Sequence, residues 1–122
     1  NTLVNKKFFD GLIFHNVVPG FVAETGDPTG TGMGGTGVTL AAEFSDTKFV
    51  RGIVGMKNDR KDYNSADSQF FILLGDAPHL EGKYTIWGKV LKGMPLLDRL
   101  RIGSPPVKPD RIVKLRIPDN DK

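Results

Sequence analysis

The stretch Ser68-Gln69-Phe70-Phe71-Ile72-Leu73-Leu74 decides how this chain is expected to fold. It ends in five consecutive apolar residues, two of which are phenylalanines. A short apolar run of this length is typical of a β-strand that is buried on both faces. The sequence therefore predicts a buried strand at residues 68–74.

Four other segments are also predicted to be strands. Residues 52–56 and 85–90 are short, largely apolar runs and read as buried strands. Residues 14–23 are rich in β-branched and aromatic residues, and the Pro19-Gly20 pair within them predicts a bend or bulge. Residues 111–117 are mostly apolar, with basic residues at 111, 114 and 116, which favours a final, half-exposed strand.

Helical features are confined to two segments. Residues 1–8 are predicted to be the end of an amphipathic helix, and residues 94–102 a helix with Pro95 in its first turn and Gly103 as its stop. The length of 122 residues allows one domain and no more. We therefore expect one mostly-β domain, a barrel or a sandwich, with two flanking helices.

The composition excludes several kinds of chemistry. The chain has no cysteine, so disulfides, zinc–thiolate sites and cysteine nucleophiles are excluded. Its two histidines, His15 and His79, have no spacing that builds a metal site, and we expect no metal and no cofactor. His15 lies in an apolar strand, where a hydrogen-bonded core histidine is the favoured interpretation. Ser68 lacks the context of a hydrolase nucleophile.

No apolar run approaches the ~20 residues of a membrane span, and the first residues lack the apolar block of a signal peptide. The compartment stays unknown, with the cytoplasm or an organelle interior as the expectation. The net charge is +3. Basic residues gather near Lys57 and again near Arg111, but acidic residues are interleaved with them. We interpret both groups as solvated faces and expect no nucleic-acid partner.

Residues 26–37 form a glycine-rich segment that invites a phosphate-binding interpretation. The segment lacks the Gly-Lys-Ser/Thr ending of a P-loop and is not predicted to open a helix. It is therefore predicted to be a surface loop that needs unusual backbone angles.

Four longer motifs carry a family resemblance. They lie in the segments 14–21, 26–32, 64–72 and 80–90, and the tail segment 105–113 follows them. In this order and spacing they closely resemble the cyclophilin family of peptidyl-prolyl cis-trans isomerases, of the bacterial or organellar kind. The resemblance implies an antiparallel β-barrel with two helices, the isomerisation of X-Pro bonds in protein substrates, and proline-containing peptides or proteins as partners.

The resemblance also assigns roles to individual residues. Phe21 and Phe71 match the two aromatic residues of the family's proline pocket, although core packing is the alternative for both. Val22, where methionine is usual, and Leu80 match its aliphatic lining. Two amide side chains match groups that bind the substrate backbone. These are Asn58 and Gln69.

Other positions depart from the family pattern. Asn16 stands where the family has its catalytic arginine, and Glu24 stands where a glutamine steadies that arginine. A neutral amide cannot present a guanidinium fork, and Glu24 offers no evident compensation. Three further departures vary within the family. These are Lys57 for alanine, His79 for tryptophan and Tyr84 for histidine.

Three functions remain open. The chain is an isomerase of reduced turnover, a catalytically silent module that binds proline peptides, or a structural subunit of a larger assembly. The segment that precedes Phe8-Phe9-Asp10-Gly11 in the family supplies two strands and most of a helix. We therefore expect residues 1–122 to be an incomplete cyclophilin-like domain. An unpaired strand edge is expected at residues 111–117 or 14–23.

Overall fold

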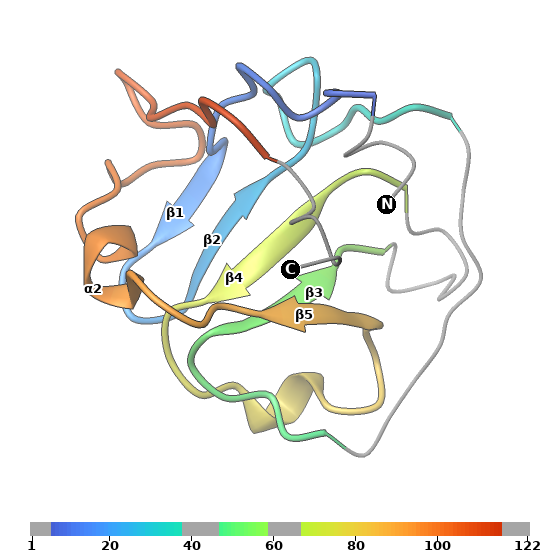
Figure 1. Cartoon of the computed structure of the whole chain (residues 1–122), viewed down its shortest axis with the longest axis vertical. Helices are drawn as coiled ribbons and strands as arrows, with labels where there is room; N and C mark the ends of the chain where they lie inside the picture. Colours follow the sequence, from blue (N-terminus) through green and yellow to red (C-terminus); the bar gives the residue numbers. More distant parts are fainter. Residues whose placement is uncertain (1–5, 38–46, 59–66, 116–122) are drawn as a thin grey trace, which may run out of the picture.

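The computed structural model describes residues 6–37, 47–58 and 67–115. Within these ranges the chain forms one five-stranded antiparallel sheet in the order β1-β2-β4-β3-β5, so β4 lies in the middle (Figure 1). The strands are β1 (Asn16–Val18), β2 (Val22–Thr25), β3 (Ile53–Met56), β4 (Phe70–Leu73) and β5 (Ile86–Lys89). The mostly-β prediction is confirmed.

The central strand β4 is buried along its whole length. Phe71 and Leu73 point into one apolar cluster of the protein, and Phe70 and Ile72 point into another. Successive side chains of a strand face opposite sides of the sheet, so an uninterrupted apolar run is what a strand covered on both faces requires. The strand predicted at residues 68–74 is confirmed for this reason.

The first two strands form a hairpin. Val18 pairs with Val22, and the amide of Phe21 donates to the carbonyl of Val18 across 3.1 Å. Gly20 has a φ of 74°, which glycine adopts without the strain a side chain would bring. The bend predicted at Pro19-Gly20 is confirmed as the turn of this hairpin.

The sheet separates the two apolar clusters. The first cluster consists of Val22, Phe49, Ile53, Phe71, Leu73, Ala77 and Leu80. The second is built from Phe9, Met56, Phe70 and Ile72. In the second cluster the Phe70 ring contacts those of Phe9 and Trp87 edge-on, with centroid distances of 5.5 and 5.1 Å. Both faces of the sheet are therefore covered by the chain itself.

The helices are shorter than the sequence indicates. The helix predicted at residues 94–102 is reduced to α2 (Met94–Leu97). Of the helix predicted at residues 1–8, residues 6–8 are turns and residues 1–5 lie outside the described residues. Beyond α2, the amides of Arg99 and Leu100 donate to carbonyls three residues back, and Leu96 is 65% exposed. A helix that buries so little gains little from packing, which explains its early end. A 3₁₀ turn, η1 (Pro78–Leu80), was not predicted.

The strand predicted at residues 111–117 is wrong within the described part, which ends at residue 115. Arg111 forms an isolated bridge with Ile13, and the amide of Ile112 donates to the carbonyl of Leu12 across 2.8 Å. This segment pairs with an irregular partner and not with a strand, so no regular ladder follows.

The described sheet is open, with β1 at one edge and β5 at the other. The edge expected within residues 14–23 is therefore β1, but its outer side is partly covered. Val17 and Gly103 exchange two backbone hydrogen bonds, of 2.9 and 3.2 Å, and the amide of Phe14 donates to Asp110.

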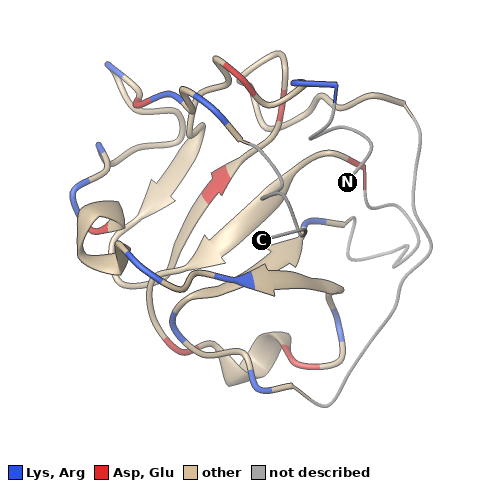
Figure 2. Cartoon of the chain, in the orientation of Figure 1, with Lys and Arg blue, Asp and Glu red and all other residues tan. Residues whose placement is uncertain are grey.

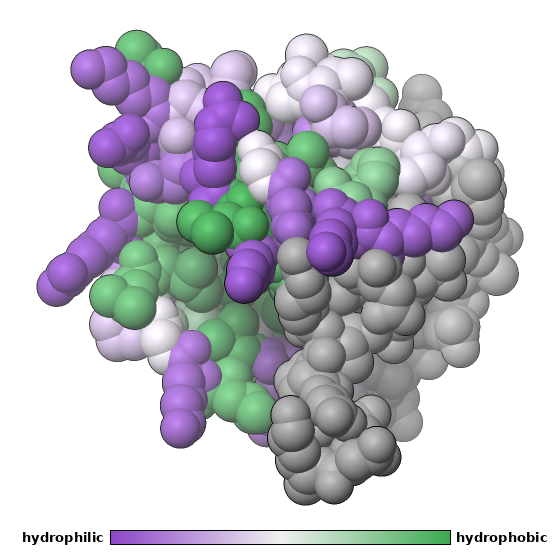
Figure 3. Space-filling view, turned by 45° about the horizontal axis from the view of Figure 1, so that its top comes forward, coloured by the Kyte–Doolittle hydropathy of each residue, from purple (hydrophilic) through white to green (hydrophobic). Residues whose placement is uncertain are grey.

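The surface combines charged side chains with scattered apolar ones, as the purple and green atoms of Figure 3 show. Among the described residues, the large apolar side chains with the highest exposed fractions are Met33, Leu91, Leu96, Ile102, Val107 and Val113. No helix in the described ranges is long and apolar enough to cross a membrane.

Candidate functional site

Four residues form a row across the sheet. Asn16 pairs with Glu24, Glu24 pairs with Phe71, and Phe71 pairs with Gly55. Residues directly opposite each other in antiparallel strands point to the same face of the sheet. The row therefore places a polar pair beside an aromatic ring on the face that carries the first apolar cluster.

Gly55 and Tyr84 hold the ring of Phe71 in place. A Cβ atom at Gly55 would collide with Cζ of that ring, so the ring lies over the glycine. Tyr84 meets it edge-on with a centroid distance of 5.4 Å. Phe71 is only 4% exposed. Its ring occupies space on the adjacent strand β3 that Gly55 leaves open because glycine has no side chain.

Glu24 is the charged group at the centre of the row. Asn16 Nδ2 donates to its Oε2 across 2.9 Å, and Lys57 Nζ donates to its Oε1 across 2.8 Å. Glu24 is 14% exposed and Lys57 is 37% exposed. In Figure 2 the red segment on β2 is Glu24, and strands β1, β4 and β3 contain no charged residue.

This cluster changes two interpretations made from the sequence. The sequence places Lys57 in a solvated basic face and also leaves open that Lys57 or Arg60 fills the gap left by the missing arginine. The ammonium of Lys57 is bound to Glu24, and Arg60 lies outside the described residues. The sequence shows no evident compensation for Asn16 by Glu24, but Glu24 contacts Asn16 and Lys57 at once. Sequence reasoning could bring Lys57 toward the gap at Asn16 but did not predict its bond to Glu24, because the two charged residues are 33 positions apart. The only signal in the sequence was that a carboxylate, Glu24, and an ammonium, Lys57, both stand at positions where the sequence departs from the family pattern.

His15 lies next to this cluster and is 3% exposed. Its Nε2 is 3.8 Å from Glu24 Oε1, and neither ring nitrogen has a hydrogen-bond partner among the described residues. The hydrogen-bonded histidine expected from the sequence is therefore wrong. Burial lowers the pKa of His15 and Lys57 lowers it further, while Glu24 and Asp27 oppose the shift. The imidazole is accordingly neutral at physiological pH.

The apolar residues assigned by resemblance come together. Val22, Phe71 and Leu80 belong to the first cluster and are buried, and Tyr84 packs against it. Phe21 lies in the hairpin turn and is 36% exposed, and its ring centroid lies 5.9 Å from that of exposed His79. The set therefore has a buried part on the sheet and an exposed aromatic part at the turn.

The two amide side chains, Gln69 and Asn58, bind the chain's own carbonyl groups. Gln69 Nε2 donates to Gly32 O and Gly34 O across 3.1 and 2.8 Å. Asn58 Nδ2 donates to Lys83 O across 2.9 Å. Their amide nitrogens therefore brace neighbouring loops. Their amide oxygens are buried and have no hydrogen-bond partner in the part of the chain that the structure describes.

The glycine-rich loop is organised around Asp27, which is 1% exposed. Its carboxylate accepts hydrogen bonds from the amides of Thr29, Gly32 and Gly34 and from the Thr29 hydroxyl. These bonds outweigh the opposing effect of burial and hold the pKa of Asp27 far below its usual range. The loop amides that a phosphate would need already face an anion of the chain, which supports the interpretation as a surface loop.

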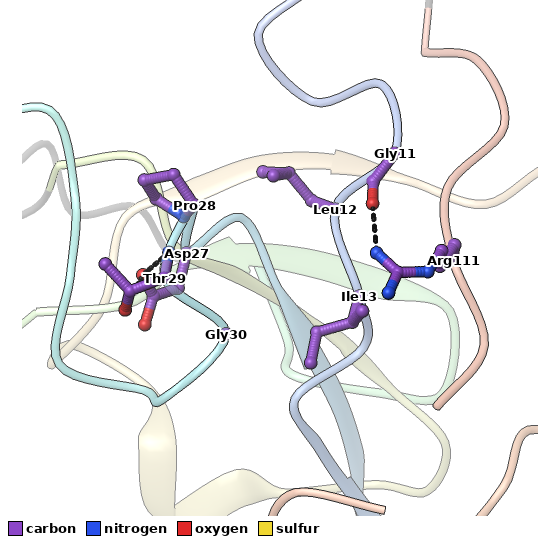
Figure 4. Close-up of a pocket in the computed structure, with 8 residues that line it drawn as sticks. All are labelled: Gly11, Leu12, Ile13, Asp27, Pro28, Thr29, Gly30 and Arg111. Carbon is purple, nitrogen blue, oxygen red and sulfur yellow. Dashed lines mark hydrogen bonds between the residues drawn. The ribbon is translucent and has the colours of Figure 1, made fainter. Parts of the chain in front are cut away.

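A cavity of about 180 Å³ lies beside this loop (Figure 4). It is lined by Gly11, Leu12, Ile13, Asp27, Pro28, Thr29, Gly30 and Arg111. Figure 4 shows Arg111 turned to the carbonyl of Gly11, to which its Nη1 donates across 2.9 Å. None of the site residues assigned by resemblance lines this cavity, so it is separate from the row on the sheet.

Comparisons with known proteins show the family to which this chain belongs. The model of the family "Cyclophilin type peptidyl-prolyl cis-trans isomerase/CLD" matches residues 1–117. A probable peptidyl-prolyl cis-trans isomerase of Brucella abortus is 42% identical over 137 aligned positions, which cover 98% of this chain and 69% of that protein. The peptidyl-prolyl cis-trans isomerase-like 3 protein of Gallus gallus is 45% identical, over 80% of this chain and 63% of its own.

Solved structures give the same result. A Cryptosporidium parvum cyclophilin type peptidyl-prolyl cis-trans isomerase, crystallised in the presence of the dipeptide Ala-Pro, superimposes with a TM-score of 0.88 at 33% identity. The match covers 98% of this chain and 82% of that one. A cyclophilin of Hirschia baltica shares the fold with a TM-score of 0.78 at 22% identity. The chain belongs to the cyclophilin-type peptidyl-prolyl cis-trans isomerase family.

Proposed function

We propose that the face carrying Asn16, Glu24 and Phe71 is an isomerase site for X-Pro bonds of peptides and proteins. The observation that carries this proposal is the row itself, which sets a hydrogen-bonded polar pair beside a fixed aromatic ring. An apolar wall suits the proline ring, and polar groups beside it suit the neighbouring backbone.

The reaction makes modest chemical demands. Rotation about the X-Pro bond faces a barrier of about 18–20 kcal/mol because the amide is conjugated. No covalent step is needed. Conjugation is lost in the twisted state, so the prolyl nitrogen becomes a hydrogen-bond acceptor. A donor placed there stabilises the transition state more than the ground state, and this difference accelerates rotation.

We expect turnover at least tenfold below that of family members with an arginine at the position of Asn16. The Asn16 side chain is short and neutral, and its amide nitrogen already donates to Glu24. Loss of a charge-assisted donor to a transition state costs roughly 2–4 kcal/mol. The same engaged amide favours a second candidate function, a silent module that binds proline-containing segments without isomerising them.

An isomerase assay with a short X-Pro peptide, combined with an NMR titration of the same peptide, separates these functions. Accelerated exchange supports the isomerase. Peptide-induced shifts of the Phe71 amide without acceleration support the silent binder, and neither effect supports a structural subunit of a larger assembly.

Two exposed side chains provide a test variant and its matched control. Phe21→Ala removes the aromatic group at the hairpin turn, and Met33→Ala removes a side chain that is 90% exposed on the glycine-rich loop. Peptide binding should weaken roughly tenfold in the first variant, since one apolar contact surface is lost. It should stay unchanged in the second. Equal binding by both variants would exclude Phe21 from the site.

A further inference from the structure

An X-Pro isomerase needs a hydrogen-bond donor that is free to meet the prolyl nitrogen. The donor of Asn16 is bound to Glu24, and the Nε2 group of Gln69 is bound to two loop carbonyls. Nδ2 of Asn58 donates to Lys83 O. The neutral amides assigned to the site therefore all have partners within the chain. Gln69 Nε2 uses both of its protons, and Asn16 Nδ2 and Asn58 Nδ2 each keep one.

Lys57 differs from these amides in both charge and donor number. An ammonium carries three protons, and the bond of 2.8 Å to Glu24 uses one of them. The side chain is 37% exposed, so the remaining protons can reach a ligand on the surface. A hydrogen bond from a charged donor is roughly twice as strong as one between neutral groups.

The backbone places Lys57 on the correct side of the sheet. Its amide donates to Gln69 O across 2.9 Å, which continues the pairing of β3 with β4 by one residue. Side chains alternate along an extended chain, so Lys57 shares a face with Gly55, two residues earlier, and hence with the Phe71 ring above Gly55. The ion pair with Glu24, on the far side of Phe71, agrees with this placement.

We propose that Lys57 is the cationic hydrogen-bond donor of this site, and that Glu24 is the positioning residue that holds its ammonium beside Phe71. The inference rests on the proposed isomerase function and names the group that drives it. Asn16 occupies the other oxygen of Glu24 and leaves Oε1 to Lys57. Because His15 is neutral, the charges of Lys57 and Glu24 balance each other within this cluster.

The test uses two variants of Lys57 and one control. Lys57→Met removes the charge and keeps the length, and Lys57→Arg keeps a donor. Lys48→Met is the matched control, because Lys48 also pairs with a glutamate, Glu81 at 3.6 Å, but is 77% exposed. In the X-Pro assay we expect Lys57→Met to lose about tenfold or more in kcat with KM changed less than about twofold. Lys57→Arg should restore most of the loss, and Lys48→Met should match the wild type.

Glu24 is tested through its coupling to Lys57. Glu24→Gln should lower kcat several-fold. The double variant Glu24→Gln, Lys57→Met should be no slower than Lys57→Met alone, because each change disrupts the same Lys57–Glu24 ion pair. NMR spectra of each variant establish that the sheet is intact. Full activity of a folded Lys57→Met in an active wild-type background overturns the role of Lys57 alone. A wild type that binds peptide without isomerising it overturns the proposed function and the role of Lys57 together.

Discussion

Nζ of Lys57 lies 2.8 Å from Oε1 of Glu24 and joins two residues that are 33 positions apart in the chain. Asn16 donates to the other oxygen of the same carboxylate. Three departures from the family pattern, at positions 16, 24 and 57, therefore form one hydrogen-bonded unit. The sites of change are coupled, and a single substitution among them is expected to affect the other two.

Asn16→Arg is predicted to raise kcat/KM for an X-Pro peptide by about tenfold or more. A guanidinium at this position can pair with Glu24 and still present donors in a planar fork. The comparison variant is Asn16→Gln, which lengthens the side chain without adding charge and should not show the rate increase of Asn16→Arg. A wild-type rate equal to that of arginine-containing members would contradict the prediction.

Gly55→Ala is predicted to destabilise the protein by about 1–3 kcal/mol, because its Cβ would collide with the Phe71 ring. The matched control is Gly88→Ala on the edge strand β5, where a Cβ would meet nothing within 4 Å. Urea unfolding of both variants checks the difference. Similar midpoints for the two would show that the ring moves aside freely.

Stability is predicted to fall as the pH drops below about 6.5, the ordinary pKa of histidine. Burial lowers the pKa of His15 in the folded state, so the unfolded chain binds a proton more readily in this range. The stabilisation is complete above pH 6.5 and is lost as the pH falls toward the folded-state pKa.

Unfolding midpoints at pH 7.5 and 5.5 measure this dependence. His15→Phe should reduce it, because the imidazole nitrogens have no partner to lose. His79→Gln alters an exposed histidine and should retain it. An unchanged dependence in His15→Phe would assign the effect to another group.

Asp27→Asn is predicted to destabilise the protein at pH 7 by about 1–3 kcal/mol, since the buried carboxylate accepts four close hydrogen bonds from the loop. The folded-state pKa lies below the ordinary value of 3.8, so this stabilisation is present above pH 4 and is lost at lower pH. The gap between wild type and variant should narrow accordingly. Asp110→Asn, at an exposed bond to the Arg101 amide, should cost less. Equal losses would refute the special role of Asp27.

Local pattern was sufficient for four of the five predicted strands and for the family, although the strand predicted to be buried at residues 85–90 is a partly exposed edge strand. Residues 68–74 could be predicted because an apolar run that serves two faces is a local property, and the Pro19-Gly20 turn because glycine permits a positive φ. The same local reasoning overestimated the helix at residues 94–102 and the strand at residues 111–117. Both depend on what covers them, and neither finds a regular partner among the described residues.

Only the tertiary structure decided which residues of the site contact one another. The sequence by itself determined which residues depart from the family pattern, namely Asn16, Glu24 and Lys57, but each could be interpreted alone. The pairing of β1 with β2, β2 with β4, and β4 with β3 sets these three side chains on one face around Phe71. Hydrogen bonds and ion pairs act over a few ångströms in space, whatever the separation along the chain, so the register of the sheet makes these residues one site.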